Sequence, residues 1–303
     1  MDRREFIRSS LQLAITAAAI GGTPWLDLAA LAAPAPLTPP LAMRKGKDIP
    51  ATVRAAVLAL GGMGAFVKAG EVVVVKPNIG WDRTVELAAN THPLVVRTVV
   101  ELCLEAGAKK VLVFDRTCND PRRCYVESGI AGAVEGLKSA KVSMEQIDRR
   151  AFIDVDIKGG IDQQRWSFYQ PALNADRFIN LPIAKHHSIS TVTVGMKNIM
   201  GVIGGNRGTM HRNIAEALAD INTIIRSDLT IVDATRILVA NGPQGGRLED
   251  VKILDTIIAS PDIVAADAYS ATLFGLQPRD ISSIVAGAKR GLGTLDLQKV
   301  RMV

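Results

Sequence analysis

The chain has 303 residues, of which 48% are hydrophobic, 22% are charged and only 4% are aromatic. This composition suits a globular protein of one large or two small domains and excludes a largely disordered chain. The formal net charge of +6 fits a preference for anionic small molecules or membrane surfaces, and it does not indicate a nucleic-acid partner, because the Lys and Arg residues are scattered.

The N-terminus has the pattern of a twin-arginine export signal. Arg3 and Arg4 precede Phe6 and a short, weakly hydrophobic run, and the small residues that a signal peptidase reads end at Ala32. We therefore expect a signal peptide over residues 1–32, the twin-arginine translocation machinery as a partner, and a periplasmic or other extracytoplasmic location. A short, uncleaved membrane anchor is the alternative.

Residues 33–50 are rich in Pro and Ala and then turn basic, which predicts a linker between the signal and a single domain at 51–303. The domain begins with a helix at TVRAAVLALGGM, a strand at EVVVVKPN, a helix at THPLVVRTVVELCLEAG and a strand at KVLVFD. A strand, a helix and a strand in this order indicate a crossover between parallel strands.

The middle of the chain predicts a helix around 126–137 and strands near Val142 and Phe152. Next come a strand at DRFINLPIAK, helices at about 190–200 and 212–225, a strand at LTIVDAT, a strand and a helix within TIIASPDIVAADAYSATLFG, and a final helix at DISSIVAGAKRG. No later apolar run is long enough to span a membrane. The elements predict an α/β fold, with a mostly parallel or mixed sheet and helices on both faces.

Polar residues follow the expected strands at their carboxyl ends, where open α/β sheets bind ligands. These residues are Lys76, Asn78, Asp115, Lys185, His186, His187 and Asp233. Each could simply be a polar strand end that meets solvent, but their recurrence favours a common cleft.

The segment KHHSISTVTVGMKNIMG combines core and polar positions. Helical spacing places Val192, Met196 and Ile199 on one apolar face, whereas Lys197 lies on another side and Asn198 follows it. A lysine and an asparagine near the end of a helix can also complement its dipole and cap it, which is the structural alternative.

The histidines lie beside turns, strand ends or glycine-rich segments and not within apolar stripes. They are His92, His186, His187 and His211. We expect at least one of them to act as an acid, a base or a metal ligand, although a satisfied structural histidine is the common alternative. Two glycine-rich loops could direct backbone N–H groups at an anion, with Arg207 adding charge, or could be simple turns.

Two of the three cysteines, Cys118 and Cys124, lie in or beside the polar loop RTCNDPRRC. An oxidising compartment favours a disulfide between them. Cys103 lies in a helical pattern and fits a small buried hydrophobic position. A three-cysteine metal site is the alternative, although the spacing matches no zinc or iron–sulfur pattern.

The order of the segments is specific. The series VVVVKPN, THPLVVRTVVELCLEAGAKKVLVFD, RFINLPIAKHH, TVGMKNIMGV, LTIVDATRILVANGPQGG and SPDIVAADAYSATLFG, from about Val72 to Gly293, resembles domain of unknown function family 362. The resemblance maps family motifs, without assigned roles, onto Lys76, Pro77, Asn78, His92, Asp115, Lys185, His187, Lys197, Asn198, Gly201, His211, Asp233, Gly242, Pro243 and Asp267. Many members resemble iron–sulfur proteins because they append a ferredoxin-like cysteine cluster, and this sequence contains no such cluster.

The sequence therefore predicts an exported protein with a cleft for an anionic small molecule or a metal-bearing cofactor of unknown identity. We expect catalytic roles for His186, His187, His211 and Lys197, and ligand-binding roles for Lys76, Asn78, His92, Asp115, Lys185, Asn198, Arg207 and Asp233. These residue types support proton transfer or redox chemistry, in which a histidine acts as acid, base or ligand and lysines neutralise the anion. A periplasmic binding or assembly protein without catalysis is the alternative.

Overall fold

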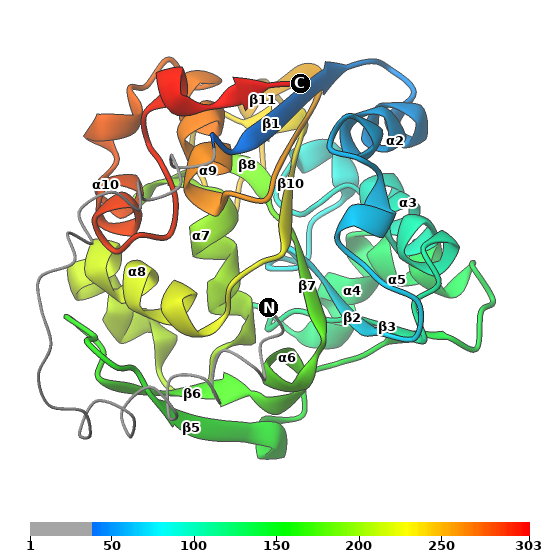
Figure 1. Cartoon of the computed structure of the whole chain (residues 1–303), viewed down its shortest axis with the longest axis horizontal. Helices are drawn as coiled ribbons and strands as arrows, with labels where there is room; N and C mark the ends of the chain where they lie inside the picture. The colour runs from blue at the N-terminus through cyan, green and yellow to red at the C-terminus, as the bar shows by residue number, and fades with distance from the viewer. Residues whose placement is uncertain (1–37) are drawn as a thin grey trace, which may run out of the picture. The chain divides into compact units, whose positions relative to one another are not determined.

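The computed structural model describes residues 38–303, which form one unit built on a large mixed β-sheet (Figure 1). The expected signal peptide at 1–32 and the first part of the expected linker lie outside the described residues. No helix among residues 38–303 has the length and apolar character needed to cross a membrane.

The main sheet has ten strands. They are β1 (Pro40–Lys45), β2 (Val72–Pro77), β3 (Lys110–Val113), β4 (Val142–Met144), β7 (Arg177–Leu181), β8 (Ile183–His187), β9 (Thr191–Thr193), β10 (Leu229–Leu238), β11 (Val251–Ser260) and β12 (Arg301–Met302). Their order is β12-β1-β11-β10-β7-β2-β3-β4, while β8 pairs with β10 and with β9. The strands from β10 to β4 in this order are parallel, whereas β11 is antiparallel to β10 and β1, which confirms the mixed sheet.

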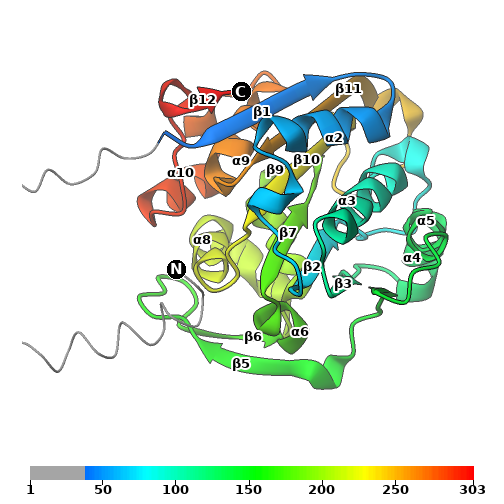
Figure 2. The ribbon, with the colours of Figure 1, turned by 45° about the vertical axis from the view of Figure 1, so that its right-hand side comes forward.

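Helices cover both faces of this sheet, as predicted (Figure 2). One face carries α2 (Ile49–Ala59), α3 (Pro93–Glu105), α4 (Pro121–Glu127) and α5 (Ile130–Glu135). The other carries α7 (Gly195–Asn198), α8 (Ile214–Ile224), α9 (Ile263–Thr272) and α10 (Ser282–Lys289). Thus α3 forms the predicted crossover between the parallel strands β2 and β3.

The central strand β2 shows why its sequence is a continuous run of valines. Val73 and Val75 join the apolar cluster beneath α2 and α3, whereas Val74 points the other way, into the cluster beneath α8, α9 and α10. Successive side chains of a strand point to opposite faces, so a strand buried on both sides must be apolar throughout. The strand ends at Pro77, which has no N–H to continue the ladder.

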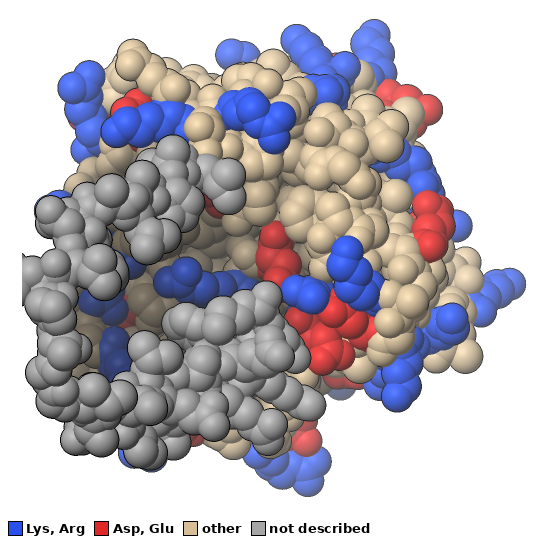
Figure 3. All heavy atoms as spheres, in the orientation of Figure 1, with Lys and Arg blue, Asp and Glu red and all other residues tan. Residues whose placement is uncertain are grey.

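Smaller elements lie outside the main sheet. Strands β5 (Phe152–Asp156) and β6 (Arg165–Tyr169) form a separate antiparallel pair, followed by α6 (Gln170–Asn174). The 3₁₀ helices are η1 (Met63–Ala65), η2 (Val85–Leu87), η3 (Arg149–Ala151), η4 (Ile199–Val202), η5 (Arg207–Asn213), η6 (Leu248–Asp250), η7 (Pro278–Asp280) and η8 (Leu297–Lys299). On the face shown in Figure 3, Lys and Arg side chains of the described residues are distributed widely and mixed with Asp and Glu.

Two local predictions are corrected by the structure. Residues 40–45, expected within the linker at 33–50, form β1, because the buried Leu41 and Ala42 pack against opposite faces of the sheet and the strand pairs with β11. Residues 191–193, expected within a helix, form the short strand β9 because they pair with β8, and the helix begins only at Gly195.

Candidate functional site

A pocket of about 400 Å³ opens where the predicted strands β2, β3 and β8 end. Within the sheet, β3 and β4 follow on one side of β2, and the chain later returns to place β7 on the other side of β2. The strand order therefore reverses beside β2. Ligands of open α/β sheets bind at such a reversal, outside the carboxyl ends of the strands. The charged and polar residues that line the pocket include Lys76, Asn78, Asp115, Arg116, Cys118, Lys185, His187, Thr193, Lys197, Asn198, Arg207 and His211.

A buried ion pair forms the floor of this pocket. Lys76 Nζ lies 2.9 Å from Asp115 Oδ1, and the two side chains are 1% and 3% exposed. Asp115 Oδ2 accepts a hydrogen bond from the backbone N–H of Ile79 at 2.6 Å, while Oδ1 receives no well-directed hydrogen bond from the described residues. Burial lowers the pKa of Lys76, and the charge of Asp115 opposes this effect.

Asn198 joins three of the elements around the pocket. Its Oδ1 accepts hydrogen bonds from Lys76 Nζ at 2.8 Å and Asn78 Nδ2 at 3.1 Å. Its Nδ2 donates to the Lys76 carbonyl at 3.1 Å and to Asn180 Oδ1 at 2.8 Å. Asn78 Oδ1 in turn accepts from Lys185 Nζ at 3.1 Å. The amides therefore fix the ammonium groups of two strands relative to α7.

The position of α7 depends on a carboxylate from α9. Asp267 Oδ1 accepts from Gly195 N–H at 2.6 Å and its Oδ2 accepts from Met196 N–H at 3.0 Å. Burial raises the pKa of Asp267 to about 7. A Cβ at Gly195 would lie 2.7 Å from Asp267 Oδ1, too close for a side chain, so glycine is required for this contact. Asp267 thereby places Lys197 and Asn198 at the pocket.

Two lysines of the pocket titrate near neutral pH. Lys185 donates to Asn78 Oδ1 and to the Ala89 carbonyl, and burial lowers its pKa to about 7. Lys197 donates to Met200 Sδ at 3.4 Å, and burial lowers its pKa to about 8. A free lysine has a pKa of about 10.4. Both lysines can therefore gain or lose a proton at physiological pH.

The imidazoles of His187 and His211 stack, with ring centroids 5.7 Å apart and planes 18° apart. His187 Nδ1 accepts the backbone N–H of Ile189 at 3.1 Å, which leaves the proton of the neutral ring on Nε2. His211 Nδ1 lies 3.2 Å from the Gly208 carbonyl and therefore donates, so that its Nε2 accepts from Lys197 Nζ at 3.2 Å. Burial and nearby Lys197 lower the pKa of both rings, that of His187 to about 3, so both are neutral at neutral pH.

Two arginines tie the loop at η5 to the loop after β3. Arg207 donates to the carbonyls of Arg116 at 2.7 Å and Thr117 at 2.6 Å. Arg116 donates back to the Ile203 carbonyl at 2.8 Å. Arg207 Nη2 also lies 3.6 Å from Cys118 Sγ. These guanidinium groups fix the wall of the pocket and add positive charge to it.

The structure brings most of the expected site residues together. Those that line the pocket are Lys76, Asn78, Asp115, Lys185, His187, Lys197, Asn198, Arg207 and His211.

Three of the expected site residues do not line the pocket and instead hold backbone N–H groups. His92 caps α3 by accepting from Leu94 N–H at 3.0 Å, and burial lowers its pKa to about 4. Asp233 lies inside β10, not at its end, and accepts from the His92 N–H at 2.7 Å. His186 accepts from Gly242 N–H at 3.1 Å. All three thus accept backbone hydrogen bonds outside the pocket.

The structure does not contain the predicted Cys118–Cys124 disulfide, since both residues are free thiols. Cys124 is buried in α4, with its Sγ 3.8 Å from the Gly80 carbonyl, whereas Cys118 is exposed and lies beside Arg207. Cys103 is buried in α3, as predicted. Among residues 38–303, no three His, Cys, Asp or Glu side chains are placed to hold a metal ion, so these cysteines do not fit an iron–sulfur cluster.

Sequence reasoning missed Thr193 and Arg116 as parts of the pocket. Thr193 pairs directly with Lys185 in the β8–β9 ladder, and side chains that are directly opposite share one face of a sheet. The expected helix over residues 190–200 concealed this pairing. Arg116 directly follows the expected site residue Asp115, and this adjacency in the sequence could have identified Arg116 as a pocket residue.

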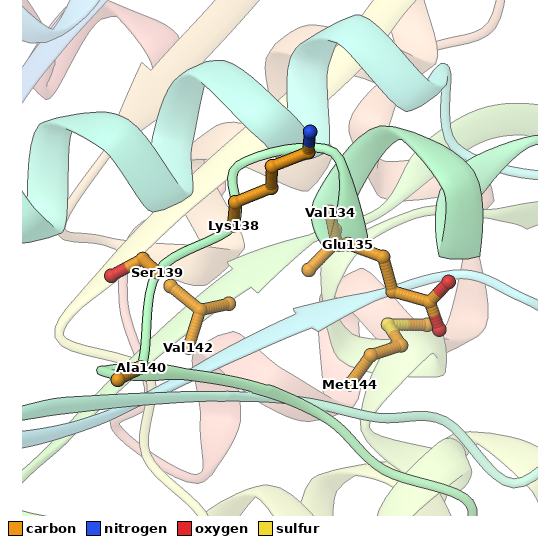
Figure 4. A pocket seen from close by; sticks show the side chains of 7 residues that line it. All are labelled: Val134, Glu135, Lys138, Ser139, Ala140, Val142 and Met144. Carbon is orange, nitrogen blue, oxygen red and sulfur yellow. The ribbon is translucent and has the colours of Figure 1, made fainter.

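A smaller hollow of about 270 Å³ lies between α5 and the edge strand β4 (Figure 4). Its lining consists of Val134, Glu135, Lys138, Ser139, Ala140, Val142 and Met144. It lies away from the carboxyl ends of β2 and β8 and contains a single residue of each charge. The larger pocket is therefore the candidate functional site.

Comparisons with known proteins agree with the order of the sequence motifs. The family described as "Domain of unknown function (DUF362)" matches residues 73–272. The thylakoid-associated protein sll1697 of Synechocystis sp. is 30% identical over 250 residues, which cover 80% of this chain and 75% of the relative.

Two solved structures have weaker similarity. A protein from Thermotoga maritima has 12% sequence identity and a TM-score of 0.44, with 77% of this chain and 60% of the other covered. The lactate racemase apoprotein from Thermoanaerobacterium thermosaccharolyticum has 8% identity and a TM-score of 0.48, with 76% and 56% covered. This chain thus spans less than two thirds of either solved chain.

Proposed function

The chain belongs to the family named domain of unknown function 362. On that premise we propose that it is an enzyme that removes a proton from a small bound anion, or returns one to it. The observation that carries this proposal is the contact between Lys197 Nζ and His211 Nε2 inside a cation-rich pocket.

The charges of the pocket favour an anionic ligand. Its lining contains the cationic groups Lys76, Lys185, Lys197, Arg116 and Arg207, against the single carboxylate of Asp115. Asp115 already pairs with Lys76, so the remaining cations have no carboxylate among the lining residues to balance them. An anion placed among them would raise the pKa of the lysines and be held by their charge.

Lys197 has the properties of a general acid–base group. Its pKa of about 8 lies near physiological pH, where such catalysis is efficient. A bound anion raises this pKa further, so the neutral amine is the minor form of Lys197, and that form can take a proton from an acidic C–H or O–H of the anion. His211 Nε2 then accepts a hydrogen bond from the resulting ammonium, and Lys76 and Lys185 stabilise the negative charge that remains on the substrate.

Hydrogen–deuterium exchange tests this proposal. Solvent deuterium should enter the acidic positions of one or more small carboxylates or phosphate esters in the presence of the protein, as followed by proton NMR. We expect Lys197→Met to slow this exchange by about 10²- to 10⁴-fold. The control variant is Lys299→Met, since the Lys299 side chain is 76% exposed and forms a surface ion pair with Asp296 at 3.5 Å. Equal exchange rates for the two variants would refute the role of Lys197.

A non-catalytic periplasmic carrier is the second candidate function. The observation that favours it is the rigid network in which buried Lys76 and Lys185 are held by Asn198 and Asn78, since preorganised donors suit tight binding without turnover. Anions that bind with no catalysed exchange in any of them would assign this role.

We further propose that the chain is exported by the twin-arginine route. The supporting observations are the Arg3-Arg4 pattern before an apolar run and the similarity to a relative described as thylakoid-associated. The mature N-terminus in the periplasmic fraction of the native host should be Ala33. Replacement of both arginines by lysine should retain the protein in the cytoplasm, and unchanged export of that variant would exclude the route.

A further inference from the structure

We propose that Thr193 binds the ligand directly and forms, with Lys76 and Lys185, an inner subsite for the oxyanion head group of a small molecule. This inference rests on the proposed function, because it assumes that the pocket takes an anion. The subsite would determine where the anionic group of the ligand lies and which part of the ligand faces Lys197.

The hydroxyl of Thr193 is the first observation. Thr193 is 4% exposed and lines the pocket, and its Oγ1 has no hydrogen-bond partner among residues 38–303. Ser190, on the turn just before β9, is also buried, but its hydroxyl donates to the Val192 carbonyl at 3.0 Å. Buried hydroxyls nearly always have a partner, and a ligand oxygen in the pocket that Thr193 lines would supply one.

The ammonium groups beside it supply the second observation. An ammonium carries three N–H donors. The contacts of Lys185 Nζ within the described residues are with Asn78 Oδ1 and the Ala89 carbonyl, and those of Lys76 Nζ are with Asn198 Oδ1 and Asp115 Oδ1. Each protonated lysine therefore keeps a donor in addition to these contacts. Together with the Thr193 hydroxyl they present several donors to one occupant, which suits an anion with several oxygen atoms.

The register of the sheet places these donors together. Lys185 and Thr193 are directly paired in the β8–β9 ladder, so their side chains leave the same face of the sheet. Lys185 is linked to the Lys76 side chain through Asn78 and Asn198. The inner subsite is therefore built from three strands, β2, β8 and β9, and one amide network holds its two lysines.

Burial separates this subsite from the proton-transfer pair. Lys76, Lys185 and Thr193 are all buried, whereas Lys197 and His211 are partly exposed. An anion that places its oxygens on the inner donors would direct its adjacent atoms outward, toward Lys197 Nζ. The ligand class is thus a small molecule whose carboxylate or phosphate lies next to the atom that loses the proton.

The experiment compares Thr193→Val with Thr193→Ser, using inorganic phosphate and malonate as probes in titration calorimetry of the mature protein. Valine keeps the shape of threonine without its hydroxyl, whereas serine keeps the hydroxyl. We expect Thr193→Val to weaken binding of the preferred probe by about 10-fold or more, because one hydrogen bond to a charged group is lost. Thr193→Ser should bind it within about threefold of the unsubstituted protein, since the difference is one methyl group.

Thermal unfolding without added anion gives an independent readout. Because the Thr193 hydroxyl has no partner in the described residues, Thr193→Val should unfold at the same temperature as the unsubstituted protein or at a higher one. A lower Tm would show that the hydroxyl has a structural role and would overturn the inference.

The binding outcomes are also decisive. A response to phosphate alone assigns a phosphate head group, and a response to malonate alone assigns a carboxylate. Equal affinity of Thr193→Val and the unsubstituted protein for both probes, or binding of neither probe, would overturn the subsite. If Thr193→Val weakens binding but Lys197→Met leaves deuterium exchange unchanged, the subsite stands and the proposed proton transfer fails.

Discussion

Replacement of Gly201 by alanine should break the ion pair at the floor of the pocket. Gly201 lies in η4, and a Cβ there would fall on Asp115 Oδ1 and Lys76 Nζ, far inside the contact distance of real side chains. The backbone has little freedom to move away, since the Gly201 carbonyl accepts the N–H of Arg116 at 2.8 Å. Lys76 and Asp115 would therefore have to separate within the protein interior.

The cost follows from the burial of both partners. Overpacking of a close-packed interior costs about 1 to 3 kcal/mol, and disruption of a buried ion pair costs about 3 to 5 kcal/mol. Because the two effects share the same atoms and are not additive, we expect a loss of about 3 to 5 kcal/mol in the free energy of unfolding. For a chain of this size the Tm should fall by roughly 10 °C in a thermal unfolding assay.

Gly132→Ala is the matched control. Gly132 lies in α5, and a Cβ there would meet no atom within 4 Å, so the variant should be as stable as the unsubstituted protein or up to about 1 kcal/mol more stable. If Gly201→Ala and Gly132→Ala unfolded at the same temperature, the close approach of Gly201 to the ion pair would be refuted.

Three further predictions concern ionisation, thiols and the cap of α7. The pKa of Lys185 is about 7 in the folded chain and about 10.4 in an unfolded one, so the unfolded chain binds more protons between these pH values. The free energy of unfolding should therefore rise with pH from about 7 to 10. Urea titrations at a series of pH values should show a smaller rise for Lys185→Met. Native labelling with iodoacetamide should modify Cys118 alone, because Cys103 and Cys124 are buried and burial raises the pKa of Cys124 to about 11; mass spectrometry that found Cys124 modified, or Cys118 blocked by oxidation, would contradict this arrangement. Asp267→Ala should lower the free energy of unfolding by about 2 kcal/mol or more in urea, since two buried N–H groups lose their acceptor, and Asp267→Asn, which keeps one acceptor oxygen, should lose less.

The part of the site that sequence predicts best is the part set by parallel strands. The valine run of β2 and the apolar end of β3 identify buried strands, and α3 between them identifies a crossover. In a parallel sheet the carboxyl ends of neighbouring strands meet at one edge, which is why Lys76, Asn78, Asp115 and Lys185 could be expected in one pocket.

The residues that sequence placed wrongly depend on long-range pairing or on side-chain direction. The three residues of β9 take their conformation from the ladder with β8, and a local pattern of this length cannot distinguish a strand from a helical turn. His92 and Asp233 look like reactive groups in the sequence, but both accept backbone hydrogen bonds in the structure. The spacing of Cys118 and Cys124 likewise gives no information on the directions in which their sulfur atoms point.

The three lysines of the pocket differ in whether a carboxylate faces them. Lys76 faces a carboxylate at 2.9 Å, whose charge favours the ammonium form against the effect of burial. Lys185 and Lys197 contact only neutral acceptors in the described chain, so burial dominates and their charge changes near neutral pH. An anion that enters the pocket supplies the missing negative charge and must therefore draw protons onto these two lysines. Its binding is thus coupled to proton uptake, and its affinity should fall as the pH rises above their pKa values.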